Sequence, residues 1–139
     1  MTPAGRPAAL SRDTPGVRPP GTSTVLVVED DAETRDLLKN FLEIEGFTVR
    51  LAADGREGLA RLHETPLACV VLLDLMMPVM DGWQFRRAQQ ADGVVAGIPV
   101  VVVSAVGARD RVEGLQAAAY LPKPIDLDRL LATIDRICG

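Results

Sequence analysis

Hydrophobic residues along the chain alternate between short continuous runs and longer segments with helical spacing. The short runs cover residues 25–28, 47–51, 67–73 and 98–103, with a shorter piece at 119–121. The third and fourth runs contain almost no polar residue, which is typical of parallel strands that are covered by helices on both faces. The pattern therefore predicts five buried strands.

Amphipathic segments separate these runs. Residues 32–45 place apolar side chains three and four positions apart, and Gly46 follows where a helix C-terminal glycine is favoured. Aspartates that can act as N-caps precede three further helical segments: Asp54, Asp81 and Asp126. Glu57 and Gln84 stand three positions after the first two, as in a capping box. A weaker helix is predicted over 110–116, where Gly114 interrupts the pattern.

The alternation predicts an α/β fold of the (βα)5 type. Right-handed helical crossovers between parallel strands favour an open, doubly wound sheet with helices on both faces. With five strands, the expected order is 2-1-3-4-5, as in flavodoxin-like folds. Functional groups in such folds lie beyond the carboxyl ends of the strands.

Composition indicates one domain with an N-terminal extension. The chain has 139 residues, of which 47% are hydrophobic, and this suits a single packed core. Residues 1–22 hold five of the ten prolines and few large apolar side chains, so we expect a disordered tail there and a folded domain over 23–139.

The charge and apolar patterns narrow the function classes. A net charge of −4 gives no electrostatic reason to bind nucleic acid or an anionic membrane. We find neither a signal-peptide-like stretch nor an apolar run of membrane-spanning length, and so expect a cytoplasmic protein. Cys69 and Cys138 stand 69 positions apart, and we expect neither a metal site nor a redox pair from them. Cys69 is predicted to be a small core residue in a reducing compartment.

Polar residues follow four of the predicted strands. The first strand is followed by Glu29, Asp30 and Asp31. The third strand ends in Asp74, the fourth ends in Ser104, and the fifth ends beside Lys123. Because the carboxyl ends of parallel strands share one edge of the sheet, these groups are expected to converge. Each residue alone is more often a helix cap, a turn residue or a solvated loop residue, and the coincidence at four strand ends is what favours a site.

Such a cluster suits phosphoryl chemistry. Carboxylates a few ångströms apart repel each other, and Mg²⁺ would relieve that repulsion while keeping some of its waters. An ammonium and a hydroxyl can hold phosphoryl oxygens. Asp74 ends the most apolar strand and is the best candidate for a nucleophile that forms an acyl phosphate.

Four segments in this order resemble the receiver domain of two-component response regulators. They are Val-Val-Glu-Asp-Asp at 27–31, Leu-Asp-Leu-Met-Met-Pro-Val-Met-Asp-Gly at 73–82, Val-Ser-Ala at 103–105 and Tyr-Leu-Pro-Lys-Pro at 120–124. The resemblance covers residues 24–139, and the second segment is close to diagnostic by itself. It implies a bacterial, phosphorylated signalling protein that is not an enzyme beyond its own phosphorylation and dephosphorylation.

The resemblance also assigns roles to individual residues. Asp74 would be the phosphoacceptor, and Mg²⁺ would be held by Asp30, by Asp74, by the backbone carbonyl of Met76 and, through a water, by Glu29. Ser104 would bind the phosphoryl group by a hydrogen bond, and Lys123 would pair with it.

Three further residues near these motifs receive roles outside catalysis. Tyr120 would be the switch aromatic that responds when Ser104 moves, although a half-buried tyrosine with its hydroxyl in water is the plain alternative. Asp31 falls outside the acidic pair and is predicted to be an N-cap. Pro124 follows the lysine where the family usually has a cis peptide bond.

The resemblance implies partners as well. We expect a histidine kinase or a histidine phosphotransfer protein as donor and a downstream target protein, without direct contact to nucleic acid or membrane. The protein would be a monomer or a weak phosphorylation-dependent dimer. The chain ends at Gly139, directly after the last predicted helix, which favours a single-domain regulator.

Alternatives remain open at this point. The chain could pass its phosphoryl group on in a phosphorelay, or be a metal-dependent phosphohydrolase of similar fold. The latter chemistry needs a general acid two residues after the nucleophile, where Met76 stands. A nucleotide- or flavin-binding module is disfavoured because no Gly-rich loop follows the first strand, and a scaffold that no longer takes phosphate is disfavoured by the complete set of residues.

Two features stand apart from the motifs. Only 18 residues separate Ser104 from Lys123, about three fewer than the family usually has. The shortening is expected in the fourth helix or its flanks, so we make no prediction of partner or dimer geometry from relatives. His63, the only histidine, is predicted to be a surface residue near the end of the second helix rather than a phosphotransfer residue.

Overall fold

The computed structural model describes residues 23–77, 79–105 and 115–139. Its strands are β1 (Thr24–Val28), β2 (Thr48–Ala52), β3 (Val70–Asp74), β4 (Val100–Ser104) and β5 (Ala119–Pro122). Its helices are α1 (Ala32–Ile44), α2 (Gly55–Leu62), α3 (Gly82–Gln90) and α4 (Leu127–Cys138).

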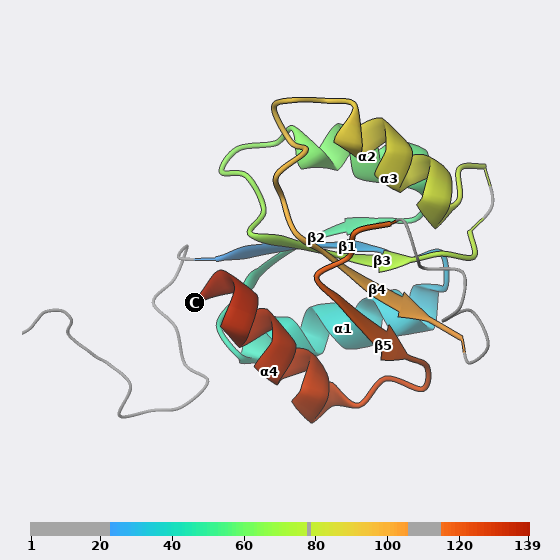
Figure 1. The fold of residues 1–139 in the computed structure, drawn as a ribbon. Coiled ribbons are helices and arrows are strands. Elements are labelled where there is room, and N and C mark those ends of the chain that lie inside the picture. The colour runs from blue at the N-terminus through green and yellow to red at the C-terminus, as the bar shows by residue number, and fades with distance from the viewer. Residues whose placement is uncertain (1–22, 78, 106–114) are drawn as a thin grey trace, which may run out of the picture.

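The strands form one parallel sheet in the order β2-β1-β3-β4-β5, which confirms the predicted topology (Figure 1). Every residue of β1, β3 and β4 is buried. This explains why their sequences show continuous apolar runs without polar alternation. β2 is an edge strand with partly exposed residues, as its position in the order requires.

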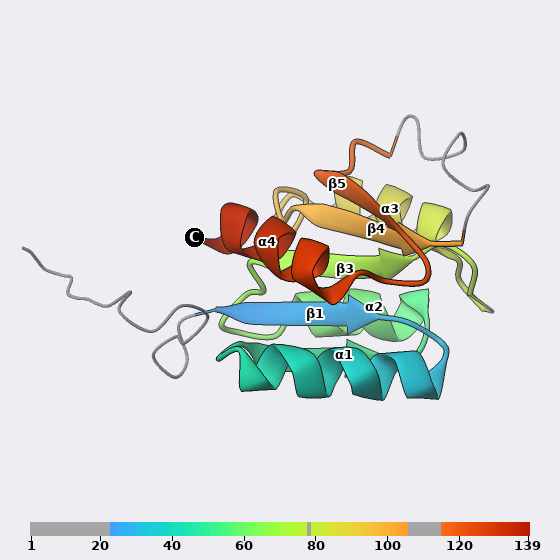
Figure 2. The same cartoon turned by 90° about the horizontal axis from the view of Figure 1, so that it is seen from below.

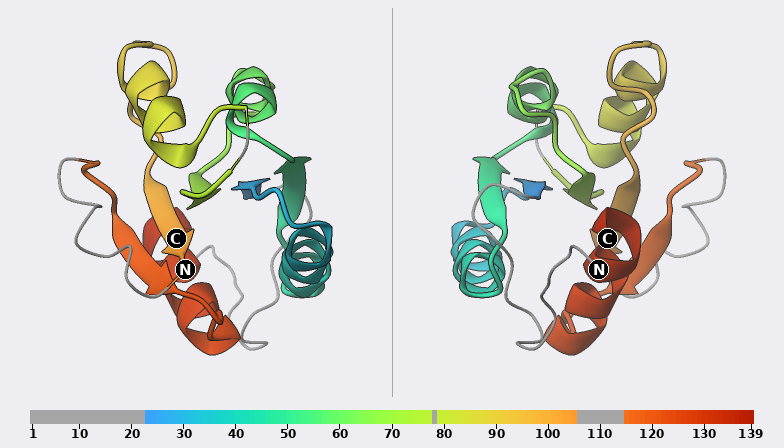
Figure 3. Two further views of the ribbon diagram at one scale, coloured as in Figure 1. Left: turned by 90° about the vertical axis from the view of Figure 1, so that its right-hand side faces the viewer. Right: turned by 90° about the vertical axis from the view of Figure 1, so that its left-hand side faces the viewer.

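Of the helices in the described residues, α1 and α4 cover one face of the sheet and α2 and α3 cover the other (Figures 1 and 3). On one face, α1 and α4 bury Leu38, Leu42, Leu130 and Ile134 against alternate residues of β1, β3 and β4. On the other face, α2 and α3 bury Leu62, Phe85 and neighbouring side chains against the remaining strand residues. The sheet is therefore fixed from both sides, and the strand ends beyond it are free to carry chemistry.

The predicted helix ends are confirmed with one difference. Asp54, Asp81 and Asp126 are N-caps, and Asp81 forms a capping box with Gln84. At α2 the Glu57 carboxylate accepts from the N–H of Ala53, one residue before the cap, and so does not complete the predicted box.

Gly46 ends α1 as predicted. Its φ of 97° lies in the left-handed region that favours glycine. The N–H of Gly46 donates to Glu43 and that of Phe47 donates to Leu42, which is the hydrogen-bond pair of a Schellman motif. This turn leads the chain directly into β2.

The weaker helix predicted over 110–116 lies almost entirely outside the described residues. Gln116, which falls at its end, is described and has a φ of 55°, so it is not helical. A side chain of α3 holds Leu115 and Gln116 in place. Arg86 donates hydrogen bonds to the carbonyls of Leu115 and Gln116, and this fixes the approach of the chain to β5.

The expectation for the cysteines was wrong. Cys69 and Cys138 form a disulfide with a Cα–Cα distance of 5.6 Å. Cys69 precedes β3 and Cys138 ends α4, and both side chains pack partly buried against the core under α4. The long sequence separation was a poor guide because α4 returns across β3.

None of the helices within the described residues combines the length and the apolar character that a membrane span requires.

Candidate functional site

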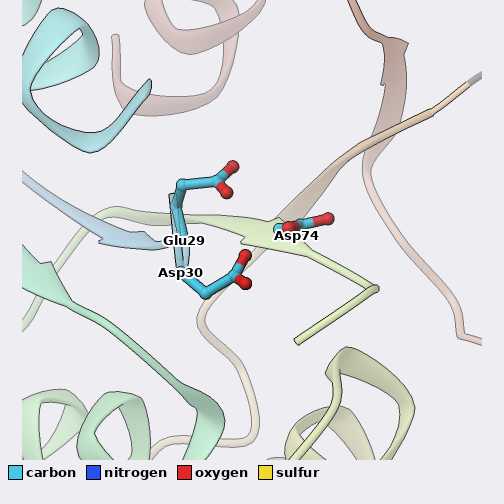
Figure 4. A group of neighbouring side chains, drawn as sticks. All are labelled: Glu29, Asp30 and Asp74. Carbon is cyan, nitrogen blue, oxygen red and sulfur yellow. The ribbon is translucent and has the colours of Figure 1, made fainter. Parts of the chain in front are cut away.

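Three carboxylates meet at the carboxyl edge of the sheet. Glu29 and Asp30 follow β1, and Asp74 is the last residue of β3. Oxygens of the three side chains lie within 4.8 Å of one another, and the side chains point toward a common space (Figure 4). Glu29 and Asp74 are 2% and 5% exposed, whereas Asp30 is exposed. The acids thus form one cluster that is open to solvent on the side of Asp30.

Lys123 brings a positive charge to this cluster. Its ammonium lies 2.9 Å from Glu29 Oε1 and 3.6 Å from Asp74 Oδ2. The residue follows β5, and its backbone N–H donates to the carbonyl of Ser104. The Lys123–Pro124 peptide bond is cis, as the family resemblance implied. One ammonium against three carboxylates leaves the cluster with excess negative charge when all three are ionised.

Ser104 contributes an unused hydroxyl. It is the last residue of β4, is fully buried, and its Oγ has no hydrogen-bond partner within the described part of the chain. A buried hydroxyl without a partner costs free energy, about 1–3 kcal/mol. A buried polar group of this kind calls for an explanation, and a ligand at the sheet edge would supply the missing partner.

The acids and the lysine shift each other's proton affinity. Burial, and next the charge of Glu29, raise the pKa of Asp74 to about 7, although Lys123 opposes the shift. Burial disfavours the Lys123 ammonium, but the hydrogen bond to Glu29 and the charges of Asp74 and Glu29 outweigh it and raise the pKa of Lys123. The lysine therefore stays charged, and the crowded carboxylates would gain from a further cation.

This arrangement can bind a hard cation and an oxyanion side by side. The carboxylate set suits a divalent ion with oxygen ligands. The Lys123 ammonium and the Ser104 hydroxyl are donors for the oxygens of a phosphoryl group. Asp74 lies between the two and could act as a nucleophile.

The sequence profile of the response regulator receiver domain matches residues 25–135. The chain belongs to this family. The fold and the order of the sheet predicted from the sequence are those of the receiver domain, and the resemblance stated from the motifs is confirmed.

Curated relatives with similar sequences are longer receiver-containing proteins. The response regulator MprA of Mycolicibacterium vanbaalenii is 42% identical over 112 residues, which cover 78% of this chain and 47% of that protein. The alkaline phosphatase synthesis transcriptional regulatory protein SphR of Synechococcus elongatus is 40% identical, with 79% and 46% covered. The chain spans about half the length of the curated relatives it matches.

Solved structures give the same result. A response regulator receiver protein from Pseudomonas putida superposes with a TM-score of 0.76 at 28% identity, covering 86% of this chain and 99% of that one. A chemotaxis protein from Vibrio cholerae superposes with a TM-score of 0.73 at 29% identity, covering 83% and 98%.

Backbone donors in this receiver domain orient the buried acids. The N–H of Asp31 donates to Glu29 Oε2 at 3.1 Å, and the N–H of Met76 donates to Asp74 Oδ1 at 3.2 Å. The Asp31 side chain caps α1 by accepting from Thr34, as predicted. Met76 is 56% exposed, and its side chain has no hydrogen-bond donor and only a weakly accepting sulfur.

Arg35 is a supporting residue that the sequence analysis missed. Its guanidinium donates to the carbonyl of Glu29 at 2.9 Å and to that of Asp30 at 3.2 Å. It thereby fixes the turn that presents both acids. Its position in the first turn of α1, close to the acidic residues, was the available signal, but an arginine at such a position has many other uses.

Tyr120 lies beside the site and not in it. It stands in β5 opposite Val102, packs partly buried against the core that α2 and α3 cover, and donates from its hydroxyl to the carbonyl of Ala105 at 3.2 Å. The ring therefore connects β5 to the residue that follows Ser104, which is where the resemblance places a switch aromatic.

Proposed function

We propose that this receiver domain accepts one phosphoryl group on Asp74 in a Mg²⁺-dependent reaction and thereby switches a protein-binding surface. The donor would be a histidine kinase or a histidine phosphotransfer protein. The observation that carries the proposal is the convergence at one sheet edge of a buried carboxylate, a lysine and a buried hydroxyl that has no partner among the described residues.

The acidic cluster fits the metal that the fold family implies. The donors are carboxylate oxygens within 4.8 Å, and one of them is exposed, so the ion could keep several waters. Asp30, Asp74 and the carbonyl of Met76 would hold Mg²⁺, and Glu29 would act through a water. When bound, Mg²⁺ would offset the repulsion among the acids and draw a phosphoryl oxygen toward the cluster.

The residues of the chain supply the rest of the transfer. An Asp74 carboxylate oxygen attacks phosphorus, a P–O bond forms, and the bond from phosphorus to the donor's nitrogen or oxygen breaks with its electron pair leaving on the donor atom. The Lys123 ammonium would neutralise charge on one equatorial oxygen. The N–H of Met76 already binds the other carboxylate oxygen of Asp74 and orients the attacking one.

The signal would leave the site through Ser104. Its buried Oγ would donate to a phosphoryl oxygen, and the end of β4 would follow it. Because the Tyr120 hydroxyl binds the carbonyl of Ala105, a shift there breaks or moves that hydrogen bond. The surface around β5 would then differ between the two states.

We propose further that the chain acts as a stand-alone receiver with a protein target and without direct contact to nucleic acid. Some relatives carry titles such as DNA-binding dual master transcriptional regulator, which describe those longer proteins. Sedimentation of the purified chain with and without phosphorylation tests the oligomeric state, with a monomer or a weak phosphorylation-dependent dimer expected. Tight binding to duplex DNA at physiological salt would contradict the proposal.

The deciding experiment is intact mass spectrometry after incubation with Mg²⁺ and acetyl phosphate. The parent should gain the mass of one phosphoryl group, and chelation of Mg²⁺ should prevent the gain. Asp74→Asn should gain nothing, because the amide is not a nucleophile. Asp36→Asn, which removes an exposed acid of α1, should behave like the parent. Phosphoryl uptake by Asp74→Asn at the parental rate would show that Asp74 is not the phosphoacceptor.

A further inference from the structure

The disulfide lies at the edge of the sheet opposite the acidic cluster. Cys69 directly precedes β3, whose last residue is Asp74, so the length of the strand separates them, about 16 Å at 3.3 Å per residue. Figure 2 shows the C-terminal end of α4 at the side of the sheet where the strands begin. The bond therefore joins structural elements without touching the residues of the proposed phosphorylation site.

Most of α4 is attached to the sheet independently of the disulfide. Leu130 and Ile134 are fully buried, and the N-cap Asp126 fixes the first turn. The last turn differs, because Arg136 and Gly139 are exposed and Ile137 is only partly buried. Opening the bond would leave the first two turns docked and would release chiefly the end of the helix.

The cysteines are also placed where small thiols can reach them. Both residues are partly exposed, and Cys138 is the last residue of α4. Buried structural disulfides within a core lack this access. The Cα atoms are 5.6 Å apart in the folded chain, so the thiols of a reduced protein would stay close enough to bond again.

We propose that Cys69 and Cys138 form a reversible thiol–disulfide site that fastens and releases the last turn of α4. In reduction, a small thiolate attacks the sulfur of one cysteine, the S–S bond breaks, and the other cysteine leaves as a thiolate. A second small thiolate then attacks the small-molecule sulfur of this mixed disulfide and releases the first cysteine. Two protein thiols and one small disulfide result, with two electrons and two protons passed to the protein sulfurs. Oxidation by a small disulfide such as oxidised glutathione is the reverse exchange.

The consequence is a local change in one surface of the molecule. In the oxidised protein, the end of α4 is held to the start of β3. In the reduced protein, this turn opens more often, while the acidic cluster keeps its geometry. The redox state of the cysteines would thus change the end of α4, whereas phosphorylation would change the opposite edge of the sheet.

The test combines thiol counting with hydrogen exchange on the full chain. After equilibration with oxidised glutathione, the parent should incorporate no alkylating reagent, and after reduction it should incorporate two equivalents. Reduction should accelerate amide exchange in residues 135–139 at least about tenfold and leave residues 25–31 unchanged.

Variants separate the bond from other effects of the reductant. Cys138→Ser should show fast exchange at 135–139 under both conditions, and Cys69→Ser should match it. Ala132→Ser, a substitution on the exposed face of the same helix, should respond to reduction like the parent. The proposal is overturned if both thiols stay reactive after oxidation, if reduction leaves exchange at 135–139 unchanged, or if it exposes the whole sheet to exchange.

Discussion

The two lysines of the chain occupy opposite environments. Lys123 is 28% exposed and lies between Glu29 and Asp74, whereas Lys39 is 39% exposed and pairs with Glu43 one helical turn away. A surface pair of the second kind contributes little, about 0.3–0.5 kcal/mol. Lys123, in contrast, is confined by two buried acids, so the shape of its charged group matters as well as its charge.

Lys123→Arg should therefore impair phosphoryl uptake while preserving the fold. The guanidinium keeps the charge that Glu29 needs but is wider than the ammonium and donates as a planar fork. We expect uptake from acetyl phosphate to fall about tenfold or more, equivalent to about 1.4 kcal/mol of barrier, with a nearly unchanged melting temperature.

Lys39→Arg is the matched control and should leave both measurements unchanged. Parental uptake by Lys123→Arg would show that the site does not need a point charge. A large fall in its melting temperature would show instead that the lysine serves the fold.

Asp30 offers a second residue-scale test, because it is the exposed member of the acidic cluster. Trp83, the only tryptophan, lines a hollow with Met76 and Asp81 next to the site and can report on it. Titration with Mg²⁺ should change Trp83 fluorescence weakly and saturably, since Mg²⁺ gives up its waters reluctantly. Asp30→Asn should lose most of the response.

Asp36→Asn removes the same charge from an exposed position of α1 and should keep the parental response. An unchanged fluorescence signal in the parent, together with no heat by titration calorimetry, would contradict a metal site in the cluster.

At the scale of elements, α3 is tied to the chain before β5 by a buried polar network. Arg86 donates to the carbonyls of Leu115 and Gln116 and to the side chain of Gln89. Gln89 in turn donates to the carbonyls of Val95 and Ile98. The carbonyls of Leu115 and Gln116 and the side-chain oxygen of Gln89 would lose their donor if the guanidinium were removed.

Arg86→Met should accordingly destabilise the protein by about 2–3 kcal/mol, because buried acceptors left without a donor each carry a desolvation cost. Chemical denaturation measures the change. Arg87→Met, at the exposed neighbouring position of α3, should cost less than about 0.5 kcal/mol. Equal effects of the two substitutions would show that the network contributes nothing beyond the loss of a surface arginine.

A second link joins the ends of α2 and α3 and depends on pH. His63, exposed at the end of α2 as predicted, contacts the carbonyl of Leu59 at 3.0 Å and the carboxylate of Asp92 at 2.7 Å. Both ring nitrogens can donate only in the imidazolium form. The hydrogen bond to Leu59, and next that to Asp92, raise the pKa of His63 above 6.5.

The sign of the effect follows from this shift. The folded protein binds the His63 proton more tightly than the unfolded chain does. The stabilisation that this proton gives is therefore complete below pH 6.5, the pKa of an unfolded histidine, and it is lost as pH rises through the higher pKa of His63 in the folded protein. The melting temperature of the parent should exceed that of His63→Gln most at acidic pH, and the difference should shrink toward pH 8, a value about 1.5 units above the unfolded pKa. A difference that stays constant or grows with pH would contradict the link.

At the scale of the whole molecule, the order of the sheet was predictable because the signal is repeated along the chain. Continuous apolar runs, helical crossovers and N-cap aspartates each point to the same parallel fold, and the structure confirms the order β2-β1-β3-β4-β5. The same logic brought Asp30, Asp74 and Lys123 together, because each follows a strand that ends at one edge.

Contacts between distant side chains were not predictable in this way. The Cys69–Cys138 bond, the Arg86–Gln89 network and the His63–Asp92 link all depend on how helices pack across the sheet. Periodicity fixes which face of a helix is buried but not which polar side chains meet. The roles assigned to Ser104, Tyr120 and the acids stay predictions.

The N-terminal boundary of the folded domain can be tested through hydrogen bonds made by the first residues of the sheet. The N–H of Thr48 donates to the carbonyl of Ser23, and that of Cys69 donates to the carbonyl of Thr24. A chain beginning at Thr22 keeps both acceptors and should melt within about 2 °C of the parent, because the proline-rich segment is predicted to add nothing to the core.

A chain beginning at Val25 loses both acceptors at the start of β1, between β2 and the lead-in to β3. Each unpaired N–H costs about 1–3 kcal/mol, so this shorter chain should melt several degrees lower. Thermal unfolding of the three chains side by side decides the matter. Equal melting of the two shortened chains would place the start of the folding unit later than Thr24. A large loss in the chain beginning at Thr22 would mean that residues 1–21 belong to it.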